Sequence, residues 1–190
     1  MKHTSIILMS AALLACGPLL AAADQGNPPS SASAEQSRTE ARKAADEAKD
    51  ANQKAAAASR RALDATAEEE SRKTAEKVRA AALQAKEAAD RAAEASAEAY
   101  QRAVDSNKAF ALRADQEAKN AMSATTEALQ KAEESLKAES ESDKEAVQKL
   151  ADERRAALQK AVAATKNALE AAKQAAKAAW KKDTEKSGKQ

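Results

Sequence analysis

The feature that most constrains this chain is a stretch of 158 residues, 30–187, that contains neither glycine nor proline. Glycine and proline are the residues that most often end a helix, so nothing in this stretch obliges a helix to stop. Alanine, the best helix former, occupies 56 of the 190 positions. A single helix of this length would reach roughly 240 Å, because each residue adds about 1.5 Å. The sequence therefore predicts an all-α fold.

Large apolar side chains are too few for an ordinary globular domain. Residues 24–190 contain eight Leu, four Val and one each of Met, Phe, Tyr and Trp. Each such side chain stabilises a fold by roughly 1.5–3 kcal/mol when it is fully buried. Ordering the chain costs about 1–2 kcal/mol per residue, which so few side chains cannot offset. This composition excludes ordinary α/β, all-β and α+β enzymes.

Alanine and other small residues recur at alternating steps of three and four, which is the period of a coiled coil. The first row consists of Ala41, Ala44, Ala48, Ala51, Ala55, Ala58, Ala62 and Ala65. The second row contains Ala75, Val78, Ala82, Ala85, Ala89, Ala92, Ser96, Ala99 and Ala103, and can be extended to Ser106 and Phe110. The third row contains Ala118, Met122, Thr125, Leu129, Ala132 and Leu136. These heptads span residues 41–136 and predict helices that pack through alanine.

From residue 136 to residue 180 a different period is visible. Large apolar residues stand 11 positions apart, at Leu136, Val147, Leu158, Leu169 and Trp180. Eleven residues make three turns of 3.67 residues each, which predicts a straight or slightly right-handed segment. The stripe is broader and more apolar than the alanine rows. It could pack as another coiled-coil face or lie on a membrane, with Trp180 at the interface.

These patterns predict an elongated Ala-rich long helix or coiled coil over residues 36–182. Acidic and basic residues four apart, such as Glu127 and Lys131, would support such a helix. The alternative is a folded-back bundle of two to four helices, with turns in the polar stretches 68–74 and 137–145. A Pro- and Ser-containing linker is expected at 24–35, and a basic tail at 183–190.

The first 23 residues are typical of a secretory signal peptide. Lys2 precedes an apolar stretch, and Ala21 and Ala23 provide the small residues of a cleavage site. The only cysteine, Cys16, lies inside the apolar stretch and also fits imperfectly the lipidation motif of bacterial lipoproteins. We expect export to the periplasm, with anchoring in the outer membrane if Cys16 is lipidated.

Once residues 1–23 are removed, the chain contains no histidine, because His3 is the only one. It also contains no cysteine, or one that is blocked by lipid. The usual general bases, thiol nucleophiles and soft metal ligands are therefore missing. We expect no enzymatic activity and no cofactor.

Charge is distributed unevenly along the chain. Residues 154–190 carry ten Lys or Arg and three acidic residues, a net charge of +7. This basic segment could bind an anionic envelope polymer or lipid. Nucleic acid is not expected as a partner of an exported protein. The alanine rows themselves predict a homo-oligomer or packing of helices within one chain.

The segments EARKAADEAKDANQKAAAASRRALDA and EAADRAAEASAEAYQRAVD, with the later ALQKA repeats, resemble the alanine-rich heptads of murein-type outer-membrane lipoproteins. This resemblance implies a helical oligomer in the periplasm, with Cys16 as the lipid site and a terminal lysine joined to peptidoglycan. The chain ends in Lys189 and Gln190, which departs from that pattern. The 11-residue blocks are similar to desiccation-linked late-embryogenesis proteins, which become helical on drying.

Two functions follow as hypotheses. The first is a non-enzymatic structural or tethering component of the bacterial cell envelope that self-associates through its alanine rows. The second is a stress-protective or membrane-surface-binding amphipathic helical protein.

Overall fold

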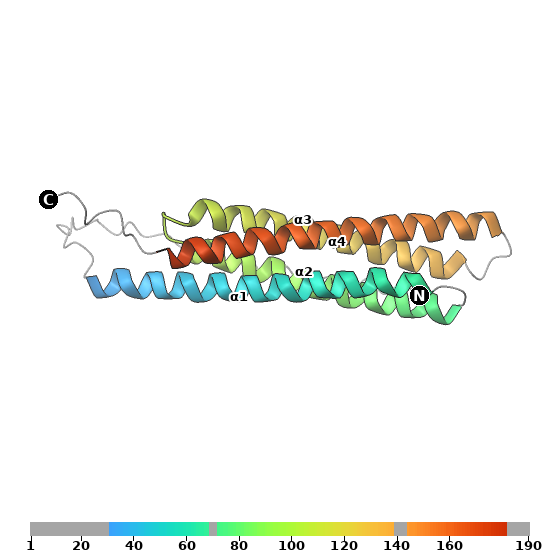
Figure 1. The fold of residues 1–190 in the computed structure, drawn as a ribbon, viewed down its shortest axis with the longest axis horizontal. Coiled ribbons are helices and arrows are strands. Elements are labelled where there is room, and N and C mark those ends of the chain that lie inside the picture. The colour runs from blue at the N-terminus through green and yellow to red at the C-terminus, as the bar shows by residue number, and fades with distance from the viewer. Residues whose placement is uncertain (1–30, 69–71, 139–143, 182–190) are drawn as a thin grey trace, which may run out of the picture.

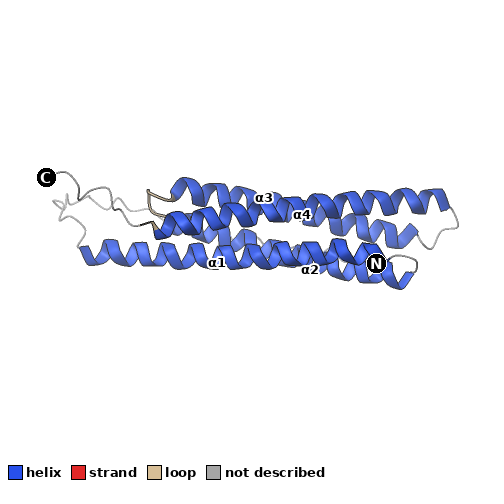
Figure 2. Ribbon diagram, in the orientation of Figure 1, coloured by secondary structure: helices blue, strands red, loops and turns tan. Residues whose placement is uncertain are grey.

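The computed structural model describes residues 31–68, 72–138 and 144–181 (Figure 1). Within this part of the chain there are four long helices and no strand (Figure 2). The helices are α1 (Ser31–Asp64), α2 (Arg72–Arg102), α3 (Lys108–Ala138) and α4 (Lys144–Trp180), and a short 3₁₀ helix, η1 (Ala65–Glu68), follows α1. The all-α prediction is confirmed, and the arrangement is the folded-back bundle that the sequence offered as its alternative.

The four helices run antiparallel to one another in succession and form a closed ring. Each helix packs along the next one in the chain, and α4 packs along α1, whereas the diagonal pairs barely touch. Helix α1 begins and α4 ends at the same end of the bundle, here called the terminal end (Figure 1). The opposite end is called the far end. At 37 residues, α4 sets the length of the rod at about 55 Å.

Two of the three turns lie where the polar stretches predicted them. The first separates Glu68 from Arg72, and the last separates Ala138 from Lys144. The residues between these positions lie outside the described part of the chain. Because the helix ends fall within the stretches 68–74 and 137–145, a single continuous helix over 36–182 does not form.

The turn between α2 and α3 was missed, and the extension of the second row through it is wrong. Ser106 and Phe110 are exposed, not buried. Residues 105–107 are Asp, Ser and Asn, three residue types that favour turns over helix interiors. The backbone N–H of Asn107 donates to Val104 O at 3.0 Å, and Asn107 O accepts from the N–H of Ala111 at 3.0 Å. Asn107 therefore ends the turn and opens α3.

Helix α1 buries more residues than the single row, spaced by three and four, that a two-stranded coiled coil needs. In α1 and the adjoining η1, a further set of residues, spaced by seven, lies beside the first row and is also buried: Ala45, Asn52, Ser59 and Thr66. A helix with two neighbours must bury a wider stripe than a helix with one neighbour. This wider stripe is why the chain folds into a bundle.

The interior of α3 and α4 differs from the prediction, because small residues and not large ones lie at its centre. In α3 the buried positions include Ala111, Ala114, Ala118, Ala121, Thr125, Ala128, Ala132 and Ser135. Met122, Leu129 and Leu136 of the third row are only half-buried. In α4 the buried residues follow a heptad of their own, through Arg154, Leu158, Ala161, Thr165, Ala168, Ala172 and Ala175.

The 11-residue stripe is therefore not a single packing face. Leu136 belongs to α3, and the other four residues belong to α4. Leu158 is buried, Val147 and Leu169 are half-buried, and Trp180 is 56% exposed. Small residues let the helices approach closely, so the larger side chains are left at the edges of the contacts.

The largest part of the core lies toward the far end and joins all four helices. It is built from Ala58, Ala62, Val78, Ala82, Ala85, Ala124, Ala128, Ala132, Ala157, Leu158 and Ala161. Nearer the terminal end, the buried clusters join only two helices each. Ala44, Ala48 and Ala99 join α1 to α2, whereas α3 and α4 meet through Ala114, Ala171, Ala172 and Ala175.

The predicted boundaries at both ends of the chain can be compared only in part. Helix α1 begins at Ser31, inside the segment 24–35 that was expected to be a linker. The predicted signal peptide 1–23, with Cys16, lies outside the described residues, and so does the predicted tail 183–190.

Candidate interaction surfaces

The alanines that were singled out for association lie inside the bundle. Ala51 is half-buried, and the others are buried: Ala44, Ala48, Ala55, Ala58, Ala62, Ala82, Ala85, Ala89 and Ala92. They pack against other helices of the same chain. In the folded rod these rows are therefore not on the surface that a partner would meet.

A buried polar pair, which sequence reasoning missed, fixes how α1 and α2 align. Asn52 Nδ2 donates to Ser96 Oγ at 3.0 Å and to Ala48 O at 2.8 Å. Both side chains are almost fully buried. Sliding one helix along the other would leave these groups without partners in an apolar interior, which is costly. The available signal was an asparagine in the buried set of residues spaced by seven in α1.

A second buried polar contact joins α3 to α4. Arg154 Nη1 donates to Ser135 Oγ at 2.9 Å, and both side chains are buried. Burial lowers the pKa of Arg154 from its usual value, although a guanidinium remains charged at neutral pH. Arg154 was counted as part of the basic C-terminal segment. It belongs to the core instead, so the basic surface of α4 is smaller than its sequence suggests.

Ion pairs between helices replace part of the pairing that was expected within helices. Lys131 binds Glu134 at 2.8 Å and Glu153 of α4 at 3.1 Å, and Glu127 binds Lys160 of α4 at 2.6 Å. The expected pair of Glu127 with Lys131 is therefore not used. The hydrogen bond to Glu134, and then that to Glu153, raises the pKa of Lys131 above its usual value.

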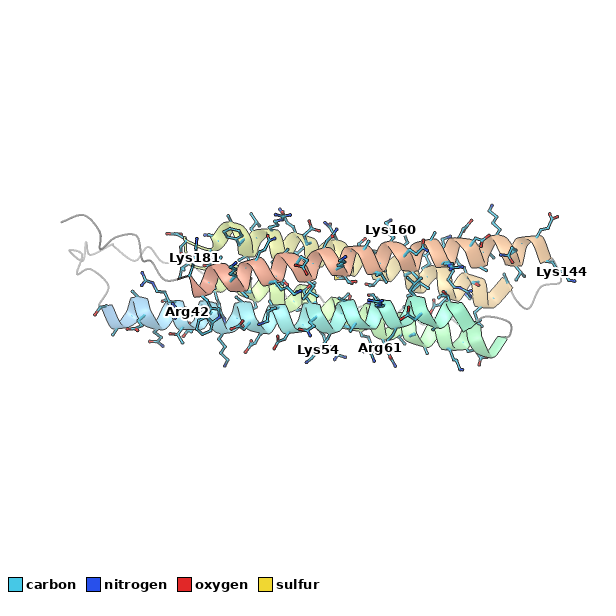
Figure 3. All side chains as sticks on the ribbon, viewed as in Figure 1. Arg42, Lys54, Arg61, Lys144, Lys160 and Lys181 are labelled. Atoms are coloured by element: carbon cyan, nitrogen blue, oxygen red, sulfur yellow. The ribbon has the colours of Figure 1, made fainter. Side chains whose placement is uncertain are left out.

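At the terminal end, α1 holds the last turn of α4 through three contacts. Trp180 Nε1 donates to Asp46 Oδ2 at 2.8 Å, and the guanidinium carbon of Arg42 lies 5.1 Å from the centre of the indole ring. Arg42 Nε also donates to Ala179 O at 3.1 Å, which satisfies a carbonyl at the end of the helix. We call Arg42, Asp46 and Trp180 the α1–α4 clamp. Figure 3 shows Arg42 on α1 and Lys181 just beyond α4, both at the terminal end.

From the middle of α4 to the terminal end, the outer side of the helix carries exposed lysines. They are Lys166, Lys173, Lys177 and Lys181, here called the lysine face. The one acidic residue of α4 in this region is Glu170, which binds Lys173 at 2.8 Å. The lysine face is a part of the basic C-terminal segment that is exposed and could meet an anionic partner.

Within residues 31–68, 72–138 and 144–181, no group of side chains could hold a metal ion. None of the four helices is long and apolar enough to span a bilayer. The predicted absence of catalytic and cofactor sites stays a prediction.

Comparisons with known proteins give no further guide to function. The chain matches no protein-family model, no curated protein and no solved structure. The resemblance to murein-type lipoproteins and to late-embryogenesis proteins therefore stays a prediction.

Proposed function

We propose that this chain is a non-enzymatic structural component of the bacterial cell envelope. It would be exported through residues 1–23 and act as a rigid rod that is held at one end. The observation that carries this proposal is the packing of small residues along all four helices. Small residues let the helices pack closely over their whole length, which favours a long, stiff rod. The rod is about 55 Å long although the chain has few large side chains.

The position of the chain ends supports attachment at one end of the rod. Ser31 and Trp180 lie at the terminal end, so residues 1–30 and 182–190 both connect to the rod there (Figure 1). An anchor in residues 1–30, such as a lipid on Cys16, would leave the far end free to project. Self-association through the alanine rows stays a prediction, and it would require copies of the chain to exchange helices.

The stress-protective or membrane-coating function is the second candidate. The observation that favours it is the number of polar side chains buried in a core of alanine, including Asn52, Asp115 and Arg154. Such a core holds the bundle together less strongly than a core of leucine, so the helices could separate onto a surface. Circular dichroism in plain buffer separates the two: a folded rod is helical without lipid or drying.

The envelope function is tested by deleting the gene in the native bacterium and measuring sensitivity to detergents and large antibiotics. We expect the deletion to increase sensitivity and the full chain to restore resistance. A version that starts at residue 24, which stays in the cytoplasm, should not restore it. Recovery of the intact chain from the cytoplasm, or rescue by the cytoplasmic version, would overturn the proposal.

The role of length can be tested separately. One heptad removed from every helix at the same level keeps the spacing of the rows and shortens the rod by about 10 Å. The segments to remove are 55–61, 87–93, 119–125 and 163–169. We expect a folded, exported protein that restores resistance less well than the full chain. Full rescue would show that the rod does not act through its length.

A further inference from the structure

Exposed large apolar side chains gather at one end of the rod. Four such side chains occur in the described residues, and three of them lie in the first turns of α3 or at the end of α4. They are Phe110, Leu112 and Trp180, which are 46%, 38% and 56% exposed. Helices α3 and α4 pack side by side, and both of these helix ends belong to the terminal end. The fourth residue, Leu83, lies in the middle of α2.

The heptad spacing indicates which side of α3 carries Phe110. Phe110 is three heptads before Lys131, which binds Glu153 of α4, so Phe110 is on the side of α3 that faces α4. Phe110 therefore stands at the groove between the two helices, and Lys181 directly follows the last residue of α4.

Exposed cations occur close in sequence to these apolar side chains. Lys173 and Lys177 stand seven and three residues before Trp180 and Lys181 follows it, whereas Lys108 and Arg113 stand two residues before and three residues after Phe110. Aromatic rings with flanking lysines suit the headgroup region of a bilayer, where the ring meets the apolar boundary and the cation meets phosphate. A soluble anionic polymer would engage the lysines but would leave the exposed Phe110 and Trp180 in water.

The α1–α4 clamp makes Trp180 available without opening the bundle. Its indole N–H already has a partner in Asp46, and Arg42 covers the ring from the side of α1. More than half of the side chain nevertheless remains exposed. The apolar rows of α4 stay packed in the core while its outer side faces away from the bundle.

We propose that the terminal end of the folded rod docks on an anionic lipid surface through Phe110, Trp180 and the lysine face. This inference rests on the proposed envelope function and names the surface to which the rod is held. It differs from an amphipathic helix that lies flat on a membrane, because here α4 contacts lipid through its outer side and the core stays closed.

Trp180 is the only tryptophan of the chain, so its fluorescence reports on this contact alone. The full chain is mixed at low ionic strength with vesicles that contain phosphatidylglycerol, or with vesicles of phosphatidylcholine only. We expect a blue shift of Trp180 emission, and quenching by brominated lipid, with the anionic vesicles. Added salt should reverse both effects, because it screens the lysines.

Two triple variants provide matched charge changes on one helix. Lys173→Glu, Lys177→Glu and Lys181→Glu together alter the proposed contact. The control variant, Lys144→Glu, Lys149→Glu and Arg155→Glu, alters three exposed cations near the far end. Residues 1–30 are the same in both, so any membrane binding by them is matched. Each lysine near an anionic surface contributes about fivefold, so we expect the first variant to lower the docking constant about 100-fold or more. The control should change it little.

Three results would overturn the inference. Trp180 emission that does not respond to anionic vesicles is the first, and an equal response in both triple variants is the second. The third is faster hydrogen exchange of the backbone amides in the alanine rows when vesicles bind, which would show that the bundle opens. In the first case, lysine-dependent binding to isolated peptidoglycan would identify a polymer as the partner.

The outcome can be separated from that of the proposed function. Vesicle docking is measured on purified protein, whereas export and rescue are measured in cells. A chain that docks on vesicles but is found in the cytoplasm would keep the lipid contact and reject the envelope function. A chain that is exported and restores resistance but does not dock on vesicles would keep the envelope function and reject the lipid contact.

Discussion

Replacing one buried alanine with leucine tests whether the helices are as closely packed as the structure indicates. Ala89 is fully buried and packs against Ala55 and Ala92, with Ala51 and Ala88 at the edge of the cluster. Leucine adds three carbons at a point where two helices meet, so Ala89→Leu should force side chains or helices apart. Overpacking of this kind costs about 1–3 kcal/mol. For a protein of this size, 2 kcal/mol lowers the melting temperature by about 4–8 °C.

The sign of the change is what makes this experiment decisive. If the helices were held loosely, the added carbons would gain about 2 kcal/mol from burial and raise the melting temperature. The control is Ala57→Leu, at an exposed position of α1, where helix propensity alone predicts a change of a few tenths of a kcal/mol, roughly. Thermal melts followed by circular dichroism measure both variants. An unchanged or higher melting temperature for Ala89→Leu would refute close packing through alanine.

Three further predictions can be checked on the same protein. Asn52→Ala and Ser96→Ala should each lower the free energy of unfolding, measured in urea, by about 1–2 kcal/mol. Because the two side chains share one hydrogen bond, the double variant should lose less than the sum of the two single losses, and strict additivity would contradict this. The hydrogen bond from Lys131 lowers the pKa of Glu134 from 4.5, so the stability that it contributes is present above that value and is lost as the pH falls through the lowered pKa. Glu134→Gln should therefore reduce the fall in melting temperature between about pH 5 and about pH 3, and an unaltered acid profile would contradict the assignment. Cys16→Ala should leave cleavage after residue 23 unchanged, as read by N-terminal sequencing, whereas acyl chains that disappear with this variant would establish a lipoprotein.

The period of the alanines was enough to predict helices and the contact rows of α1 and α2. It was not enough to predict how many helices form, because a row spaced by three and four looks the same in a long coiled coil and in a bundle. The distinguishing signal was the additional buried set that includes Asn52 and Ser59. Polar residues that recur every seven positions are expected on the surface unless the position of the neighbouring helix is known.

The stripe of large residues did not predict the packing of the C-terminal third, for a related reason. In a chain with few large side chains, Val147 and Leu169 are the expected core residues of α4, although they lie only at the border of its contacts with neighbouring helices. The contact itself is made by small residues such as Ala161 and Ala168, together with the buried Arg154. The clamp between Arg42 and Trp180 could not be predicted, because it joins residues that only the closing of the ring brings together.

The small side chains of the interior also determine how the stability of the rod changes with temperature. Unfolding raises the heat capacity by about 0.45 cal/mol/K for each Å² of apolar surface that it exposes, and lowers it by about 0.26 for each Å² of polar surface. A core of alanine, interrupted by Asn52, Thr125 and Thr165, exposes much backbone and little hydrocarbon when it opens. Its heat capacity increment per residue should therefore lie below the usual value of about 12–15 cal/mol/K. The free energy of unfolding then varies gently with temperature, so the rod keeps a modest stability over a broad range of temperature.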